Sequence, residues 1–396
     1  MQKEVVHDLR NRVLHELTHN ILPFWMSNAV DMENGGFVGR IDGEGNILPQ
    51  SDKGGILNAR ILWTFSAAWN ELKKKEYHAM AERSMEYCLC HFFDKQYGGT
   101  YWKISFDGKP ADTKKQIYSQ AFFIYALSEY YKISGEKKAL EKALELFRLI
   151  EDKSFDKELN GYFEAFNREW VLLDDLRLSV KDANEKKTTN THLHILEAYT
   201  NLYSVTSMPE VGKQLKNLIE IFLDRIISRE NHHLLLFFNE FWNTKSDLIS
   251  YGHDIETSWL VYEAAQALRD QTLIQKAKII CIDLAKASLE GLQPDGSMIY
   301  EKEGSKTDTD RHWWPQAETV VGLINLYELS GDEQYLQKAV KCWDYIENNL
   351  VDRNNGEWYW SIRNGKPNLQ DDKAGFWKCP YHNARACLEV IRRTSF

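Results

Sequence analysis

The chain alternates two kinds of predicted helix. In the first kind, apolar residues recur at three- and four-residue spacing on one face, and charged residues fill the other. One such face comprises Leu140, Ala143, Leu144, Phe147 and Ile150. This pattern predicts an amphipathic helix with one side in water. The preceding helix is apolar nearly all round at residues 121–127, which indicates burial on most sides. The alternation recurs, with inner helices expected at residues 56–72, 191–203, 255–268 and 317–329, and outer helices at 77–93, 211–227, 273–289 and 335–350.

Six short loops rich in glycine and aromatic residues separate the helical pairs. They begin at Asn34, Tyr97, Asn160, Asn231, Asp295 and Asn355. The copy at Asn231 is degenerate, because Asn231-His-His contains no glycine. Successive starts differ by 63, 63, 71, 64 and 60 residues, a period too long for one tight solenoid pair but suited to two helices and an ornamented loop. Six such units can close into a ring. We therefore expect an all-α fold, an (α/α)6 barrel, closed by pairing of a first helix (residues 3–21) with a last helix (residues 383–393).

We expect one domain over residues 1–396. The 8 prolines are scattered, and no Ser/Gly tract or charge block marks a linker. No apolar run approaches the length of a transmembrane helix, and the charged start lacks the apolar core of a signal peptide. The 6 cysteines form no CxxC motif, so we expect reduced thiols in a cytoplasmic protein.

Composition also restricts the partners. A formal net charge of −9 without a Lys/Arg stripe argues against nucleic acid. No nucleotide-binding glycine motif is present. Aromatic residues make up 13% of the chain, and many lie beside polar residues in loops. Exposed aromatic faces suit sugars, although half-buried structural aromatics explain the pattern equally well. We expect a small-molecule ligand, no membrane partner, and a monomer, with a homodimer as the alternative.

Polar and titratable residues recur at the expected starts of the inner helices. The candidates are Asn58, Arg60, Tyr118, Asn190, His194, His253, Glu256, Trp314, Glu318 and His382. A ring of helices would gather these residues around one mouth of the barrel. Each alone could be a capping or core residue, but equivalent positions in six units favour a shared site. Because imidazole titrates near neutral pH, it can act as base or acid. No serine or cysteine nucleophile motif competes, so we expect proton transfer to and from carbon.

One motif suggests a metal site. His15-Glu-Leu-Thr-His19 matches the zinc-protease pattern HExxH, which on a helix places both histidines on one face. No clear third ligand follows, and the motif is far in sequence from the other candidates. A pair on the surface of the closing helix explains it more simply, so we expect neither zinc nor another cofactor.

Longer motifs surround these helix starts. They read Leu-Asn-Ala-Arg-Ile-Leu-Trp at 57–63, Lys-Pro-Ala-Asp-Thr at 109–113, Leu-His-Ile-Leu-Glu-Ala-Tyr at 193–199, Ser-Tyr-Gly-His-Asp-Ile-Glu at 250–256, Trp-Trp-Pro-Gln-Ala-Glu at 313–318 and Trp-Lys-Cys-Pro-Tyr-His-Asn at 377–383. Together they resemble the cellobiose 2-epimerases of the N-acylglucosamine 2-epimerase superfamily. The resemblance covers nearly the whole chain. It implies an (α/α)6 barrel, in agreement with the repeat.

The resemblance also implies a reaction and its catalytic groups. The reducing-end glucose of a β-1,4-linked disaccharide, such as cellobiose or lactose, would become mannose by inversion at C2. By resemblance, His253 and His382 are the acid/base pair on either side of C2, and a cis-enediolate is the intermediate. His194 would assist ring opening or hold the enediolate oxygen. Arg60 would stabilise the developing oxyanion.

The binding residues follow from the same resemblance. Those expected to contact or orient the sugar are Tyr118, Asp182, Asn190, Glu256, Trp314 and Trp377, and we add Asn58 and Glu318 as binding residues at the same mouth. Trp314 and Trp377 would stack on the two sugars and favour a disaccharide. The chain departs from some relatives in reading His312-Trp-Trp-Pro315, which makes its substrate range less certain; proline is tolerated in a first helical turn.

Other functions remain open at this point. An N-acylglucosamine 2-epimerase and a mannose-type aldose–ketose isomerase share the enediol chemistry. An inverting glycoside hydrolase on the same barrel would need two carboxylates across the scissile bond, and Glu256 and Glu318 are the pair that could serve. A non-catalytic glycan-binding protein would explain Trp314 and Trp377 but would leave the histidines without a purpose.

Overall fold

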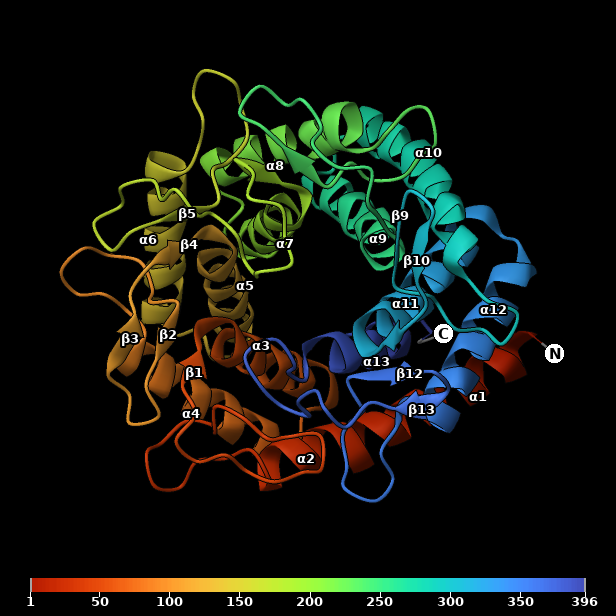
Figure 1. Cartoon of the computed structure of the whole chain (residues 1–396), viewed down its shortest axis with the longest axis horizontal. Helices are drawn as coiled ribbons and strands as arrows, with labels where there is room; N and C mark the ends of the chain where they lie inside the picture. Colours follow the sequence, from red (N-terminus) through yellow and green to blue (C-terminus); the bar gives the residue numbers. More distant parts are fainter. Residues whose placement is uncertain (1, 395–396) are drawn as a thin grey trace.

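The computed structural model describes residues 2–394. In this part of the chain, twelve helices of at least 13 residues form two concentric rings (Figure 1). The inner ring contains α3 (Gly55–Leu72), α5 (Ile117–Ser134), α7 (Thr189–Thr206), α9 (Tyr251–Leu268), α11 (Trp313–Ser330) and α13 (Tyr381–Arg393). The outer ring contains α1 (Gln2–Glu16), α4 (Lys75–His91), α6 (Lys137–Lys153), α8 (Pro209–Ile221), α10 (Gln271–Ser288) and α12 (Glu333–Tyr345).

The inner ring closes on itself. Each inner helix contacts the next along the chain, and α13 returns to contact α3. Helix α1 packs on α13, so the first and last helices pair and complete the sixth unit. The predicted (α/α)6 barrel is thus confirmed, together with the predicted manner of its closure.

The two rings differ in burial as their sequences predict. Helix α5 buries the whole of the run from Ile117 to Tyr130, whereas α6 buries one face only. On that face Phe147 and Ile150 are fully inside, while Leu140 and Leu144 lie at its edge and are half-buried. A ring that is covered on both sides must be apolar all round, whereas the outer ring needs only one apolar stripe.

The structure corrects several helix boundaries. Helices α9 and α11 begin four residues earlier than the apolar pattern indicates, at Tyr251 and Trp313. Their first turns carry polar and aromatic residues that interrupt the apolar period. Short π-helical or 3-10 turns extend four outer helices. They are η1 (Leu17–Ile21), which continues into α2 (Leu22–Ser27), η2 (Phe222–Ile226), η3 (Leu289–Gly291) and η4 (Ile346–Leu350). No helix within residues 2–394 is both long and apolar enough to span a bilayer.

All six predicted loops have the same fold. Each is closed by one antiparallel bridge at the equivalent place. The bridged pairs are Val30–Phe37, Phe93–Thr100, Phe155–Tyr162, Ile227–Leu234, Leu292–Met298 and Val351–Trp358. The degenerate copy at Asn231 is therefore a structural repeat, with His232 taking the left-handed conformation that a glycine or asparagine takes in most other copies.

Four of these loops are fixed by a buried ion pair. The pairs are Lys53–Asp31, Lys115–Asp94, Lys187–Asp156 and Lys373–Asp352. In the first three, the lysine lies two residues before an inner helix and reaches back to the aspartate that opens the loop. Lys373 makes the same contact with Asp352 but lies eight residues before α13. The other oxygen of that aspartate accepts backbone N–H groups two and three residues ahead, as Asp94 does from Gln96 and Tyr97. The loop conformation and the helix start are therefore locked together.

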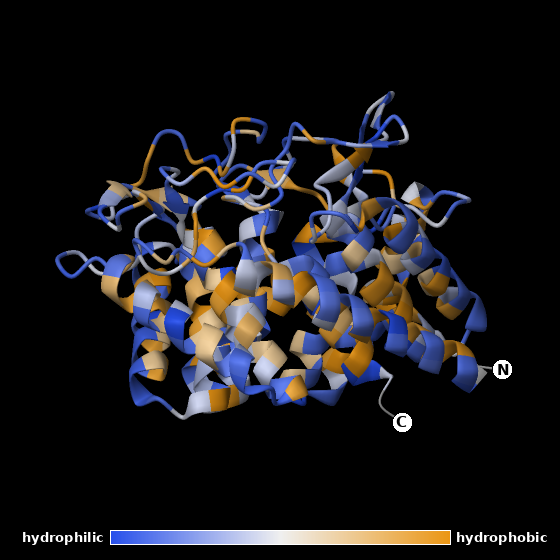
Figure 2. Ribbon diagram, turned by 90° about the horizontal axis from the view of Figure 1, so that it is seen from below, coloured by the Kyte–Doolittle hydropathy of each residue, from blue (hydrophilic) through white to orange (hydrophobic). Residues whose placement is uncertain are grey.

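Short antiparallel strands connect the loops at one end of the barrel. They are β1 (Lys53–Gly54), β2 (Lys103–Ile104), β3 (Pro110–Asp112), β4 (Lys115–Gln116), β5 (Ala165–Phe166), β6 (Lys187–Thr188), β7 (Phe237–Phe238), β8 (Ile249–Ser250), β9 (Glu301–Glu303), β10 (Lys306–Asp308), β11 (Arg311–His312), β12 (Ser361–Arg363) and β13 (Lys366–Pro367). Figure 2 shows the loops and strands above the helices, with the apolar segments concentrated inside the barrel. All inner helices begin at this loop end, which therefore holds their polar first turns.

Candidate active site

A cavity of about 390 Å³ opens at the loop end of the barrel. Ten of the twelve predicted site residues line it. They are Arg60, Tyr118, Asp182, Asn190, His194, His253, Glu256, Trp314, Trp377 and His382. Eight of these come from the first two turns of six different inner helices, and Asp182 and Trp377 come from loops. The barrel thus gathers residues that are up to about 320 positions apart, as the repeat predicts.

His382 is held by a carboxylate. Its Nδ1 donates to Glu318 Oε1 at 2.7 Å. The same oxygen accepts from Arg385 at 2.6 Å, and the second oxygen of Glu318 accepts from Trp259 Nε1 at 3.2 Å. With the proton on Nδ1, Nε2 is a free base. Burial and the neighbouring arginines lower the pKa of His382 well below its ordinary value, so the neutral form prevails in the empty cavity.

His253 is also oriented through Nδ1. That nitrogen lies 2.8 Å from the hydroxyl of Ser250, the residue before α9. Burial and the charge of His194 lower the pKa of His253 to about 3. The indole of Trp314 touches both imidazoles, with ring centres 4.7 Å from His253 and 5.6 Å from His382. Two neutral bases therefore share one aromatic neighbour in one cavity.

His194 is paired with Glu197 one turn further along α7. Its Nδ1 and Glu197 Oε2 are 3.0 Å apart. Its ring stands edge-on to Tyr118 at 4.8 Å. Burial alone would raise the pKa of Glu197. The charge of Arg385 and the hydrogen bond with His194 outweigh burial and lower that pKa to about 2. Glu197 is therefore an anion that holds the His194 ring through Nδ1.

Arg385 connects the whole cluster beneath the cavity. Its guanidinium donates to Glu256 at 2.5 Å, to Glu318 at 2.6 Å and to Glu197. Burial and the charge of Glu318 raise the pKa of Glu256 to about 7, with Arg385 opposing them. One buried guanidinium thus donates hydrogen bonds to three carboxylates, and two of these carboxylates also bond to the imidazoles of His194 and His382.

Sequence reasoning assigned no role to Arg385 or Glu197. The available signals were spacings: Tyr381 and Arg385 are four apart on α13, and His194 and Glu197 are three apart on α7, so each pair shares a helix face. Other lining residues also escaped selection. They are Leu178, Ser179, Val180, Lys181, Tyr300, Glu301, His312, Trp313, Trp360, Arg363 and Asp371.

Arg60 faces the cavity, and no carboxylate within residues 2–394 pairs with it. One nitrogen of its guanidinium donates to the hydroxyl of Tyr118 at 2.8 Å, and the guanidinium lies 4.2 Å from the ring centre of Phe122. Its Nε is buried without a partner. A guanidinium that no anion neutralises is available to a negatively charged oxygen in the cavity.

Two predicted binding residues do not line the cavity. Asn58 is buried behind the wall, and its amide donates to the backbone carbonyl of Gly54 at 2.9 Å. Its polarity is therefore explained by the start of α3 rather than by a ligand. Glu318 is fully buried beneath His382, so it can act on a bound molecule only through that imidazole.

The HExxH motif lies away from this cavity. The rings of His15 and His19 are exposed and stack on each other with centres 4.2 Å apart. Glu16 faces the opposite way, into the core, and accepts from Trp358 Nε1 at 2.8 Å. The motif therefore supplies a helix-packing contact and does not gather its three polar groups at one point.

One group of metal-ligand type is present within residues 2–394. Ligand atoms of Glu256, Glu318 and His382 lie within 4.8 Å of one another. The guanidinium of Arg385 donates to both carboxylates, so an organic cation already lies where a metal ion would sit. A divalent ion would have to displace that buried charge, which makes this group a poor metal site.

The fold and the cavity are those of an (α/α)6 barrel with imidazoles and carboxylates gathered at one mouth, and comparison with known proteins gives the family. Residues 35–386 match the model of the N-acylglucosamine 2-epimerase (GlcNAc 2-epimerase) family. A cellobiose 2-epimerase from Bacteroides fragilis is 52% identical over 97% of this chain and 98% of that protein. The structure of a cellobiose 2-epimerase from Bacillus thermoamylovorans has a TM-score of 0.95 at 42% identity, over 98% of this chain and 100% of that one.

The chain therefore belongs to the N-acylglucosamine 2-epimerase family, and it is an isomerase of the carbohydrate 2-epimerase kind. The barrel itself is more widely shared. An α-mannanase from Bacteroides thetaiotaomicron has a TM-score of 0.65 at 12% identity, over 96% of this chain and 95% of that one. That likeness shows the fold alone, and the family assignment rests on the closer relatives.

Proposed function

We propose that the protein inverts C2 of the reducing-end glucose in β-1,4-linked disaccharides such as cellobiose and lactose, giving a terminal mannose. The observation that carries this proposal is the pair of neutral imidazoles, half-buried His253 and buried His382, which face one cavity and are each oriented through Nδ1. Inversion at carbon needs a proton removed from one face and returned to the other. Two bases from different helices meet that need.

The reaction begins with the open-chain aldose. Nε2 of one imidazole takes the C2 proton, and the electrons of that bond form a C1–C2 double bond as O1 becomes an oxyanion. Arg60, which no carboxylate neutralises, stabilises this cis-enediolate. His194, held by Glu197, donates to the sugar oxygen during ring opening. In these steps the protein transfers the protons and supplies the positive charge that stabilises the oxyanion.

The second half returns a proton to the other face. After rotation about C2–C3, the second imidazole gives a proton to C2 and the carbonyl at C1 re-forms. Burial keeps both histidines neutral in the empty cavity, but the negative charge of the enediolate favours the protonated imidazole once it forms. The second histidine therefore takes a proton from solvent at Nε2 before it gives that proton to C2. The first histidine then releases the substrate proton to solvent, and in the reverse reaction the two roles are exchanged.

A disaccharide substrate is supported by the shape and lining of the cavity. A volume of about 390 Å³ lies in the range typical of small-molecule sites. Trp314 and Trp377 both line it and offer aromatic faces to two sugar rings. Asp182 adds a carboxylate from the loop above, where burial raises its pKa.

Hydrolysis is disfavoured by the position of the carboxylates. An inverting hydrolase needs two carboxyl groups about 6.5–9.5 Å apart, with the substrate between them. Glu256 and Glu318 both bind the guanidinium of Arg385, and Glu318 does not line the cavity. They cannot flank a glycosidic bond in this arrangement.

Isotope incorporation tests the proposal. With cellobiose in deuterated water, we expect a mannose-ended product that carries deuterium at C2, with the glycosidic bond intact. The deuteron comes from an imidazole that has exchanged with solvent. A ketose product would indicate an aldose–ketose isomerase, and free glucose would indicate a hydrolase. N-acetylglucosamine run in parallel tests the N-acylglucosamine 2-epimerase alternative. A mannose-ended product without any C2 label would refute the two-histidine relay.

Substitution of the bases tests the assignment of residues. His253→Ala and His382→Ala should each lower kcat by about 10²- to 10⁴-fold, the usual contribution of a general acid or base, while the protein stays folded. His312→Ala is the matched control. His312 also lines the cavity and burial lowers its pKa to about 4, but we assign it no proton transfer, so its loss should be much smaller. Near wild-type turnover in either test variant would remove that histidine from the mechanism.

A further inference from the structure

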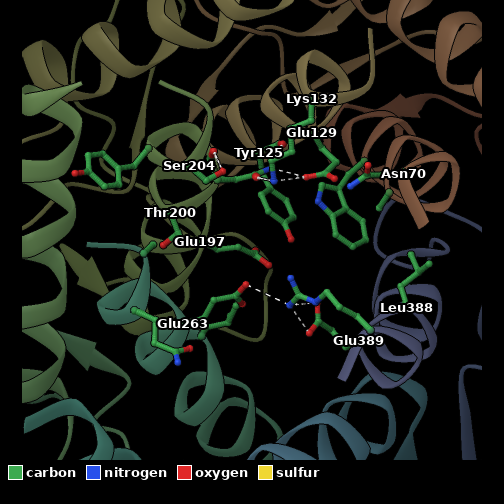
Figure 3. A pocket seen from close by; sticks show the side chains of 18 of the residues that line it. Asn70, Tyr125, Glu129, Lys132, Glu197, Thr200, Ser204, Glu263, Leu388 and Glu389 are labelled. Atoms are coloured by element: carbon green, nitrogen blue, oxygen red, sulfur yellow. Dashed lines mark hydrogen bonds and ion pairs between the residues drawn. The ribbon is translucent and has the colours of Figure 1, made fainter. Parts of the chain in front are cut away.

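A second and larger cavity, here called the distal cavity, lies at the opposite end of the barrel. It has a volume of about 710 Å³ and is lined by the C-terminal halves of α3, α5, α7, α9 and α13 (Figure 3). Among the described residues, it shares no lining side chain with the candidate active site. Its size falls within the range of cavities that hold small molecules.

The hydroxyl of a mostly buried tyrosine points into this cavity without a partner among the described residues. Tyr125 is 9% exposed, and Figure 3 shows its hydroxyl directed into the open middle of the cavity. Within residues 2–394 this hydroxyl makes no hydrogen bond. The tyrosine ring is fixed by stacking on Trp63 at 5.1 Å, and the buried indole N–H of Trp63, another lining residue, is also unpaired. Since polar groups on buried side chains are normally satisfied, the hydroxyl of Tyr125 points to a ligand with alcohol groups.

The charges of the distal cavity favour a cation. Its lining contains five carboxylates and three basic residues, namely Glu71, Glu129, Glu197, Glu263 and Glu389 against Lys132, Arg269 and Arg392. Three of the carboxylates are already paired. These pairs are Glu129–Lys132, Glu389–Arg392 and Glu197–Arg385. Glu263 has a weaker contact, with Arg392 Nη2 at 3.4 Å. It therefore retains an oxygen for a ligand, and Glu71 at the rim is also unpaired.

The helices add to this preference. All inner helices begin at the loop end, so their C-terminal ends surround the distal cavity, and helix C-termini carry partial negative charge. The carboxylate of Glu263 and the helix ends thus select the same sign of charge.

We propose that the distal cavity binds a small hydroxylated organic cation, an ammonium ion that carries alcohol groups. The ammonium group binds the carboxylate of Glu263, and an alcohol group binds the hydroxyl of Tyr125. This site does not depend on the reaction proposed above. It is nevertheless close to the active-site cluster, because Glu197 lines the distal cavity and bonds with His194 in the other one.

A matched pair of probes tests the proposal. Tris(hydroxymethyl)aminomethane is mostly protonated at neutral pH, and pentaerythritol has the same shape with a neutral CH₂OH in place of the ammonium group. Calorimetry in phosphate buffer should show saturable binding of the cation to the wild-type protein. Pentaerythritol should bind at least about tenfold more weakly, because it lacks the ammonium group that makes the charge-assisted contact with Glu263.

Three variants locate the site. Glu263→Gln should weaken the cation about fivefold and leave pentaerythritol unchanged. Tyr125→Phe, which keeps the ring stacked on Trp63, should weaken both probes about threefold. Trp314→Ala, in the candidate active site, should change neither affinity. Unfolding temperatures close to that of the wild type confirm that each variant is folded.

Distinct results would overturn the proposal. Absence of saturable binding of the cation to folded wild-type protein would remove the site. Equal affinity for the two probes would show that the charge is not recognised. A loss of cation binding in Trp314→Ala, with none in Glu263→Gln, would place the probe in the candidate active site instead.

Discussion

Glu318→Gln tests how much the negative charge of Glu318 contributes to proton transfer by His382. The substitution keeps the shape of the side chain and one oxygen at the imidazole, but it removes the negative charge 2.7 Å from Nδ1. Hydrogen bonds to charged groups contribute about 1.5–3 kcal/mol. His382 carries a positive charge only when it holds the substrate proton, so the loss falls mainly on the transition state. We therefore expect kcat to fall between about 10-fold and 150-fold.

The Michaelis constant should change little, because Glu318 does not line the cavity. Initial rates with cellobiose, measured by chromatography over a range of concentrations, separate the two parameters. Glu318→Asp, which keeps the charge on a shorter side chain, should recover part of kcat. This rescue distinguishes a charge effect on His382 from a simple loss of packing.

Glu151→Gln is the matched control. Glu151 lies on outer helix α6, and it accepts hydrogen bonds from Tyr162 and Tyr199 at 2.8 and 2.7 Å. Its substitution should lower the unfolding temperature without a specific effect on kcat. Wild-type kcat in folded Glu318→Gln would refute the reasoning, and so would an equal loss of kcat in Glu151→Gln.

The remaining predictions concern stability and metal. Lys187→Met leaves the buried carboxylate of Asp156 without its lysine and should lower the free energy of unfolding in urea by about 3–5 kcal/mol; a loss below about 1 kcal/mol would contradict the role of this pair. The hydrogen bond and charge of Asp254 outweigh burial and raise the pKa of His233, so the stability this pair adds should be complete at acidic pH and lost as the pH rises through that raised value. Urea titrations of wild type and His233→Gln across this range should therefore converge at high pH; a difference that grows with pH would contradict the sign. Exhaustive chelation should leave epimerisation unchanged, because Arg385 provides the cation between the carboxylates; a loss that zinc restores would refute this.

The sequence determined the helices and their number. Apolar spacing distinguishes inner from outer helices because burial on two sides and on one side demand different patterns. The loop repeat predicted six units, and even the copy at Asn231 has the common fold. Boundaries were less certain at the helix starts, where the polar residues that face the cavity conceal the apolar period. Ten of the twelve candidate residues line one cavity because the repeat places every helix start at the same end.

The tertiary structure alone decided which polar groups meet. Arg385 and Glu197 are 188 positions apart in the sequence, and nothing in either local pattern indicates their bond. The structure alone also decided the partner of Asn58. Its helical position resembles that of a ligand-binding residue, but its amide donates to the backbone carbonyl of Gly54. The distal cavity likewise depends on five helix ends that converge only when the ring closes. Helix formation is governed by contacts a few residues apart, whereas partners and cavities depend on how the helices are arranged around the ring.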